Sequence, residues 1–236
     1  MKITKATAQG RRSYQEDAYF ILTTSEGTYL AVLDGHGGNA CAEYCAAMLP
    51  IILHSKPILR DALAELNEKA RHMHSGSTVS IVFIPTSEDV VYTAVLGDSP
   101  IIIKRKDGSI WVSPEHNVRT NLAEADAAIE RGGFVKSGYL FAKYTGQGLQ
   151  MSRALGDAAL DRVLSREPDV SAQPIGPGSY VLVATDGAVD PSHANEAAGI
   201  AKIVNLLDAG GEAQNVVDRA LAIHTNDNVT ALLVRL

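Results

Sequence analysis

Four apolar segments rich in β-forming residues each meet an aspartate, and this pattern limits the fold more than any other feature of the chain. Val, Leu, Tyr and Thr are frequent in these segments, and runs of this kind are typical of buried strands. We therefore expect a sheet-rich framework. In chain order, the four segments span residues 28–35, 90–99, 180–187 and 227–236.

Two further segments extend the expected sheet. Residues 77–84 are predicted to form another strand, and residues 100–112 a hairpin that turns at Asp107-Gly108. Several neighbouring strands are joined by short turns, which favours antiparallel pairing. The pattern therefore predicts a largely antiparallel sheet of mixed strand order.

Helical signals alternate with these strands. Apolar residues recur at helical spacing, and prolines or paired glycines mark the ends, so the first helix is expected to stop before Pro50. Such helices would cover the sheet, which predicts an α+β fold. The expected helices span residues 39–49, 57–73, 195–211 and 212–224.

The segment from residue 117 to residue 150 is the least regular part of the chain. It combines a short helix-like run at residues 121–133 with turns that contain glycine. No internal repeat or low-complexity tract marks a domain boundary. We interpret the segment as an excursion from the sheet within a single domain of 236 residues.

Composition argues against several classes of function. The formal charge is −6 and no extended basic run occurs, which disfavours nucleic acid and anionic membranes as partners. No apolar stretch approaches the roughly 20 residues that a membrane span needs, and the first ten residues lack the apolar block of a signal peptide. We therefore expect a cytoplasmic protein. Cys41 and Cys45, four residues apart, are interpreted as buried reduced thiols.

The aspartates at the strand ends are the first candidate site. Asp34, Asp98 and Asp186 follow apolar runs, and Asp227 precedes one. In an antiparallel sheet the exit of one strand lies beside the entry of its neighbour, so all four side chains are expected to gather at one edge. Each Asp-Gly pair taken alone also suits an ordinary turn.

Gathered carboxylates need protons or cations. Two carboxylates about 4 Å apart repel by roughly 4 kcal/mol at an effective dielectric constant near 20. Mg²⁺ or Mn²⁺ prefers oxygen ligands, whereas zinc needs His or Cys ligands at a spacing that is missing here. The pattern therefore favours a hard divalent metal.

Short motifs along the chain point to a known family. The chain resembles the metal-dependent Ser/Thr protein phosphatases of type 2C (the PPM family), and the motifs follow the family's order nearly from end to end. They are RSYQED (12–17), VLDGHGG (32–38), SGSTVS (75–80), AVLGDS (94–99), MSRALGD (151–157), EPDV (167–170), VLVATDG (181–187) and NDNVTALLV (226–234).

The resemblance implies a particular architecture. The family fold is a four-layer α-β-β-α sandwich in which two mainly antiparallel sheets are flanked by helices. Residues 117–150 fall where the family has a flap beside its active site. Residues 1–236 then correspond to a single minimal phosphatase catalytic domain.

The resemblance also implies two core metal ions and their ligands. Asp34 corresponds to the carboxylate that bridges the two ions, and Gly35 to the residue whose carbonyl joins the second. Asp186 and Asp227 correspond to ligands of the first ion, and Glu16 to the acidic group that serves the second.

Further residues match the outer parts of the family's site. Asp98 and Asp190, together with Asp186, match a weaker third metal site described in part of the family. Asp17 is assigned a supporting role. Arg12 matches the arginine that holds the substrate phosphate.

His36 is the expected general acid. A leaving alkoxide needs a proton, and the imidazole two residues after Asp34 is well placed to donate it. Other polar residues are interpreted as structural: His116 in a turn or flap role, and Arg153 with Asp157 as an ion pair. His72 and His74 match no family ligand.

The sequence therefore predicts a Mg²⁺- or Mn²⁺-dependent phosphatase that acts on phosphoserine and phosphothreonine in proteins. In the mechanism that the resemblance implies, a hydroxide bridging the two metals attacks phosphorus. We expect a monomer that binds neither nucleic acid nor membrane. Two alternatives stay open: a catalytically silent pseudophosphatase that acts as a binding module, and a metal-dependent hydrolase of small phosphoesters.

Overall fold

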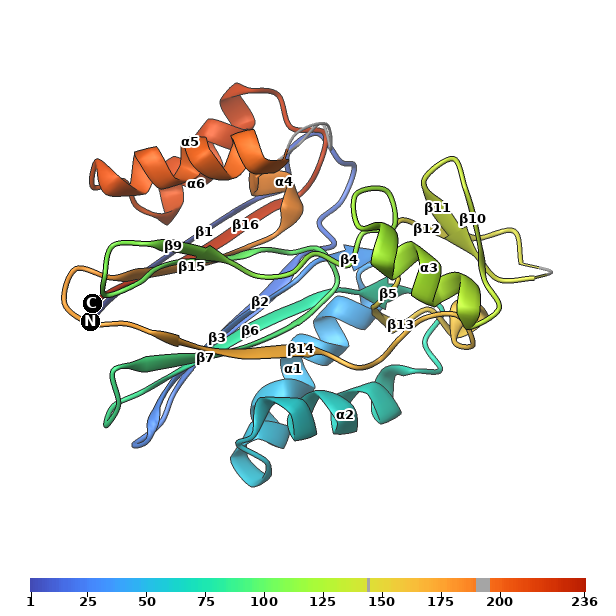
Figure 1. Ribbon diagram of the computed structural model, residues 1–236, viewed down its shortest axis with the longest axis horizontal. Coiled ribbons are helices and arrows are strands. Elements are labelled where there is room, and N and C mark those ends of the chain that lie inside the picture. The colour runs from blue at the N-terminus through green and yellow to red at the C-terminus, as the bar shows by residue number, and fades with distance from the viewer. Residues whose placement is uncertain (144, 190–195) are drawn as a thin grey trace.

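The computed structural model describes residues 1–143, 145–189 and 196–236. Two five-stranded sheets lie face to face in the middle of the molecule, and neighbouring strands within each sheet are antiparallel (Figure 1). In spatial order the first sheet consists of Lys2–Ala8 (β1), Val229–Arg235 (β16), Tyr180–Ala184 (β15), Ile101–Lys104 (β8) and Ile110–Val112 (β9). The second consists of Asp169–Pro174 (β14), Val90–Leu96 (β7), Val79–Pro85 (β6), Gly27–Leu33 (β3) and Ala18–Thr23 (β2).

Helices cover the outer face of each sheet (Figure 1). The first sheet is covered by Asp186–Val189 (α4), Glu196–Asp208 (α5) and Ala213–Ala222 (α6), and the second by Ala40–Ser55 (α1) and Leu59–Ala70 (α2). The predicted four-layer α-β-β-α sandwich of the α+β class is confirmed. Among the described residues, no helix is long and apolar enough to cross a membrane.

Two small sheets lie beside the sandwich. One has the order β13-β5-β4 and consists of Leu155–Gly156 (β13), Gly76–Ser77 (β5) and Gly35–His36 (β4), and a 3₁₀ helix, Ala158–Leu160 (η1), follows β13. The other consists of Phe134–Lys136 (β10), Tyr139–Phe141 (β11) and Gly148–Leu149 (β12), preceded by Leu122–Glu130 (α3). The predicted excursion at residues 117–150 contains α3 and this second small sheet, outside both main sheets (Figure 1).

Strand β3 is covered on both faces. Every residue of β3 is buried. Successive side chains of a strand point to opposite faces. Accordingly, Leu30 and Val32 belong to the core cluster between the sheets, whereas Tyr29, Ala31 and Leu33 belong to the cluster under α1 and α2. An alternating polar pattern is therefore absent from this strand.

Two sequence-based expectations differ from the structure. Helix α1 continues through Pro50 to Ser55 instead of ending before the proline. Proline removes only one helical hydrogen bond, and the burial of Leu49, Ile52 and Leu53 next to α2 offsets that loss. In addition, β1, β2 and β14 were not predicted. β1 and β14 carry polar, partly exposed residues and have no long apolar run, whereas β2 has the apolar run AYFIL and was overlooked.

The core between the sheets gives the first prediction. Leu232 is completely buried there. Replacement of Leu232 by Ala removes buried atoms and leaves a cavity, so the free energy of unfolding should fall by about 2–5 kcal/mol in denaturant titrations. Leu221→Ala, at an exposed position of α6, is the control and should change it little. Equal effects of the two substitutions would contradict this assignment of the core.

Candidate functional site

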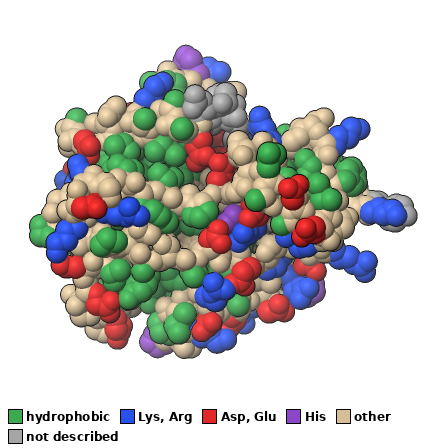
Figure 2. All heavy atoms as spheres, in the orientation of Figure 1, with side chains coloured by type: hydrophobic (Ala, Val, Ile, Leu, Met, Phe, Trp, Pro, Cys, Tyr) green, Lys and Arg blue, Asp and Glu red, His purple; other side chains and the backbone are tan. Residues whose placement is uncertain are grey.

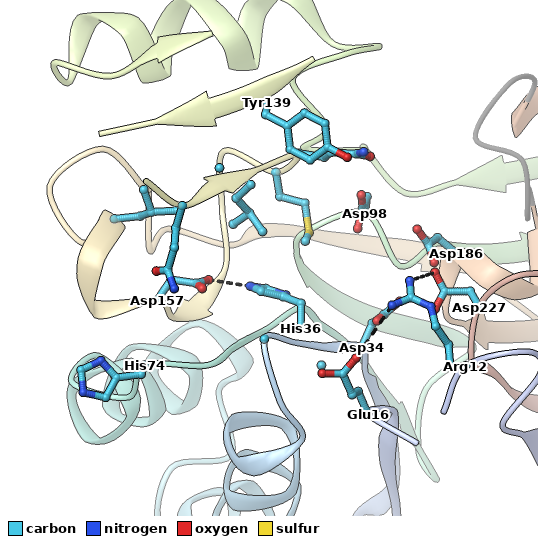
Figure 3. A pocket seen from close by; sticks show the side chains of 18 residues that line it. Arg12, Glu16, Asp34, His36, His74, Asp98, Tyr139, Asp157, Asp186 and Asp227 are labelled. Atoms are coloured by element: carbon cyan, nitrogen blue, oxygen red, sulfur yellow. Dashed lines mark hydrogen bonds and ion pairs between the residues drawn. The ribbon is translucent and has the colours of Figure 1, made fainter. Parts of the chain in front are cut away.

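The strand-end aspartates meet in one cavity of about 460 Å³. Figure 2 shows acidic side chains gathered in a hollow between the sandwich and the part of the chain that contains α3. Asp34, Asp98, Asp186 and Asp227 all line the cavity, as the sequence pattern predicts (Figure 3). The other residues named for the site from the sequence that line it are Arg12, Glu16, Gly35 and His36. Asp190 lies outside the described residues.

Thr78 orients Asp34. Asp34 directly follows β3, and its backbone N–H donates to Thr78 Oγ1 at 3.0 Å. Its carbonyl accepts from the Thr78 N–H at 2.9 Å. The Thr78 hydroxyl also bonds to the Ser99 hydroxyl at 2.8 Å, which ties the end of β3 to the loop that carries Asp98. Thr78 therefore joins two of the acidic positions.

Asn117 holds Asp98 from the other side. The Asn117 amide donates to Asp98 Oδ2 at 2.9 Å. Asn117 begins the excursion at residues 117–150, so this bond connects the excursion to the acidic cluster.

Asp17 joins the two strands that carry Asp186 and Asp227. Its Oδ2 accepts from Thr185 Oγ1 at 3.0 Å, at the end of β15, and from Thr230 Oγ1 at 2.7 Å, near the start of β16. Its Oδ1 is buried without a hydrogen-bond partner among the described residues. Burial raises the pKa of Asp17 to about 7. These contacts support the role predicted for Asp17.

Glu16 reaches the cavity through close packing of two backbones. A Cβ at Gly35 would lie 2.4 Å from the Glu16 carbonyl oxygen, so only glycine allows β4 to approach Glu16 so closely. Glu16 Oε1 accepts from the Gly38 N–H at 2.6 Å. The Glu16 N–H donates to Asn228 Oδ1 at 2.8 Å. Asn228, which sequence reasoning missed, thereby fixes Glu16 next to Asp227.

Arg12 supplies positive charge at the edge of this acidic cluster. Its Nη2 donates to Asp227 Oδ2 at 2.8 Å and its Nε to the Asn226 carbonyl at 3.0 Å. Its Nη1 lies 4.0 Å from Glu16 Oε2. About half of the side chain is exposed, so the guanidinium remains accessible from solvent.

Burial and neighbouring negative charges raise the pKa values of Asp34 and Asp186. The pKa of Asp34 lies well above its usual range because of burial and then the charges of Asp186, Asp17, Asp227 and Asp98. Burial, and then the charge of Asp227, raises the pKa of Asp186 to about 7. This excess of negative charge is what a cation would relieve.

The donor set fits a hard divalent ion. The five carboxylates Glu16, Asp34, Asp98, Asp186 and Asp227 supply only oxygen atoms, which suits Mg²⁺ or Mn²⁺ rather than zinc. In the described parts of the chain, no three side chains of Asp, Glu, His or Cys already stand as the closed ligand set of one ion. Both ions keep several waters as ligands, so a site with few protein ligands is compatible with them.

His36 pairs with an aspartate that was assigned elsewhere. His36 Nε2 lies 2.7 Å from Asp157 Oδ2, and both side chains line the cavity (Figure 3). The predicted ion pair between Arg153 and Asp157 is wrong, because Arg153 instead pairs with Glu124 and with Asp169. Asp157 therefore belongs to the site. The only sequence signal for this was that Asp157 is the last residue of MSRALGD, one of the motifs shared with the family.

Two other histidines, His116 and His74, have different surroundings. His116 is buried, accepts at Nδ1 from the Gly97 N–H, and lies with Nε2 3.1 Å from Asp169 Oδ2, which confirms its structural role. His74 lines the cavity, although no role was predicted for it. The opposite wall comes from the excursion, through Tyr139 and residues 147–150, and from Met151 directly after it. Sequence reasoning placed the excursion near the site but identified none of these wall residues.

Comparison with known proteins agrees with this geometry. The chain matches the family model described as Protein phosphatase 2C over residues 2–229. It is 31% identical to a "Probable protein phosphatase 2C 69" of Arabidopsis thaliana over 252 residues, which cover 98% of this chain and 68% of the relative. The chain spans about two thirds of the length of the first curated relatives that it matches, 68% and 65%.

Solved structures share the fold. The serine-threonine phosphatase 2C of Toxoplasma gondii superposes with a TM-score of 0.76 at 21% identity, over 98% of this chain and 93% of the other. The catalytic domain of the serine threonine protein phosphatase PstP, solved with two manganese ions, gives a TM-score of 0.62 at 19% identity, over 98% and 96%. Because the family model covers nearly the whole chain, this chain belongs to the protein phosphatase 2C family, whose members are protein phosphatase enzymes.

Proposed function

We propose that this protein is a Mg²⁺- or Mn²⁺-dependent phosphatase that hydrolyses phosphoserine and phosphothreonine in proteins. The observation that carries the proposal is the meeting of five carboxylates, Arg12 and His36 in one cavity. The two manganese ions named for the PstP structure support the same choice of metal.

Each group has a role that its position suits. Asp34, Gly35, Asp186, Asp227 and Glu16 would hold two ions, and Asp98 with Asp186 a weaker third. Asp190, which the family resemblance adds to that third site, lies outside the described residues. When bound, such ions activate water and neutralise the charge of the phosphate. The chain's own residues then have to bind the phosphoryl group, align the leaving oxygen and protonate it.

Arg12 binds the phosphate in this proposal. Its planar guanidinium can donate two parallel hydrogen bonds to phosphate oxygens, and it already lies beside Asp227 with half of its surface exposed. The phosphoryl group is thereby held next to the acidic cluster.

His36 acts as the general acid. As the bond between phosphorus and the Ser or Thr oxygen breaks, a ring N–H of the protonated imidazole passes its proton to that oxygen, and the ring becomes neutral. The alcohol then leaves without developing an alkoxide charge. Tyr139 and residues 147–151, on the opposite wall, would contact the protein chain that carries the phosphate.

Two alternatives give different experimental results. A pseudophosphatase would bind metal and phosphopeptide without turnover, but the described ligand positions all keep acidic side chains. A hydrolase of small phosphoesters would share the site and prefer free phosphoesters to phosphopeptides. A cytoplasmic location and a monomeric state stay predictions from composition.

Metal dependence is the first test. Asp34→Asn removes a central carboxylate, so hydrolysis of a phosphothreonine peptide with Mn²⁺ should fall by at least about 10²-fold and calorimetric Mn²⁺ binding should weaken. A chelator should abolish the wild-type activity. Asp208→Asn, which changes an exposed carboxylate paired with Lys104, should act like wild type. Activity that survives chelation would contradict the metal mechanism.

The general acid is tested with two leaving groups. His36→Ala should slow hydrolysis of the phosphothreonine peptide by about 10²–10⁴-fold. An aryl phosphate has a leaving group that needs less protonation, so His36→Ala should slow its hydrolysis much less. His54→Ala, in the last turn of α1, is the matched control. Equal losses on both substrates would count against His36 as the acid.

Phosphate binding is tested at Arg12. Arg12→Ala removes charge-assisted hydrogen bonds to phosphate. The loss of one such bond, worth about 1.5–3 kcal/mol, already raises KM by about 10- to 100-fold, so KM for the peptide should rise by at least about 10-fold. Arg12→Lys should recover part of the affinity. Arg11→Ala, at the exposed neighbouring position, should leave KM unchanged. An unchanged KM in Arg12→Ala would remove Arg12 from the phosphate site.

A further inference from the structure

We propose that Asp157 is a positioning residue that holds the His36 imidazole in the cavity, and that the bare backbone of Gly76 makes this contact possible. The inference rests on the proposed function, in which His36 protonates the leaving oxygen. Nothing in the comparisons assigns a role to either Asp157 or Gly76.

Among the described residues, the His36 imidazole makes one hydrogen bond. Its Nε2 lies 2.7 Å from Asp157 Oδ2. Its Nδ1 is buried and has no hydrogen-bond partner among the described residues. Because one hydrogen bond alone orients the polar edge of the ring, loss of Asp157 would leave the ring free to turn about its side-chain bonds. Figure 3 shows the two side chains pointing toward one another.

The small sheet β13-β5-β4 brings the pair together. His36 on β4 is opposite Gly76 on β5, and Gly76 is opposite Gly156 at the end of β13. Asp157 comes directly after Gly156, so the two side chains reach each other across the central strand. A Cβ at Gly76 would lie 2.1 Å from Asp157 Oδ2 and 2.2 Å from His36 Nε2. Any side chain at this position would therefore separate the pair.

The backbone holds Asp157 in an unusual conformation. Its φ is +53°, in the left-handed region that non-glycine residues adopt infrequently. The Asp157 N–H donates to the Ser75 carbonyl at 3.2 Å, and the neighbouring Gly156 carbonyl accepts from Arg166 Nη2 at 2.6 Å. Strained residues that surrounding contacts hold in place are concentrated at active sites. The carboxylate is thus presented to His36 from a fixed position.

A purely structural role and a positioning role for Asp157 predict different kinetics. If the role were purely structural, loss of the Asp157 carboxylate would lower stability or reduce kcat equally on all substrates. A positioning role predicts a loss only where His36 is needed, that is, on a substrate with a poor leaving group. Misplacement of a reacting group by about 1 Å can cost about 10²-fold in rate.

The experiment compares kcat on a phosphothreonine peptide and on an aryl phosphate, with Mn²⁺, in a set of single and double variants. Asp157→Ala should lower kcat on the peptide by about 10- to 100-fold and on the aryl ester far less, with Mn²⁺ affinity unchanged. Asp157→Asn, whose amide oxygen still accepts from Nε2–H, should recover part of the loss. In a His36→Ala background, Asp157→Ala should add no further loss, because contacting residues of one unit are not additive.

Gly76→Ala is the sharpest variant. It keeps both His36 and Asp157 but places a methyl group between them, and the φ of Gly76 imposes no strain on alanine. The same peptide-selective loss is expected. Two variants serve as controls. In Gly176→Ala the atoms nearest to the added Cβ belong to the flexible Lys106 side chain, and Asp89→Asn changes an exposed carboxylate far from the pair in sequence. Thermal unfolding of each variant shows that it is folded.

Two failures are distinguishable. If His36→Ala lowers kcat on both substrates equally, the proton-donor role fails and the positioning role fails with it. If His36→Ala is selective for the peptide but Asp157→Ala and Gly76→Ala are not, Asp157 does not position His36, while the proposed function stands. An additive loss in the His36→Ala background would likewise overturn the positioning role.

Discussion

Repulsion between carboxylates is the constraint on which the rest of this structure depends. Asp34, Asp186 and Asp227 lie at the ends of three strands from two sheets. Burial raises the pKa values of Asp34 and Asp186, and the negative charge of Asp227 raises both further. Such an arrangement costs free energy unless a cation or protons offset it. A chain under no functional demand would separate these groups, and their assembly is the observation on which the proposed metal-dependent function rests.

The sandwich supplies the rigidity that this assembly needs. Antiparallel register places Ala184 opposite Ala231, which fixes the exit of β15 beside the entry of β16 and hence Asp186 near Asp227. Thr78, Asp17 and Asn228 then cross-link the loops at these strand ends by hydrogen bonds to backbone and hydroxyl groups. The residues proposed as metal ligands are thereby held by buried polar contacts rather than by loop conformation alone.

Sequence reasoning found the parts of the site that are local in the chain. An apolar run followed by aspartate is visible within about ten residues, so Asp34, Asp98 and Asp186 could be predicted. Asp157 and Tyr139 could not, since their place in the cavity depends on how the small sheets fold back on the sandwich. The layer order came from the family resemblance, because many α+β folds share the same strand and helix pattern.

The incorrect sequence-based predictions also concern features that depend on contacts between distant segments. The end of α1 was misplaced because packing against α2 outweighs the local effect of Pro50. The predicted Arg153–Asp157 pair was wrong because each side chain instead pairs with a residue from a distant segment of the chain. Edge strands such as β1 and β14 carry partly exposed residues and give a weak periodic signal.

The most direct test of the central claim is anomalous X-ray diffraction from crystals grown with Mn²⁺. The account predicts two strong manganese peaks in the cavity, one within coordination distance of Asp34, Asp186 and Asp227 and the other beside Asp34, Gly35 and Glu16. Crystals that diffract well but show no manganese in this cavity, or show it only elsewhere on the surface, would contradict the claim that these carboxylates form a two-metal site.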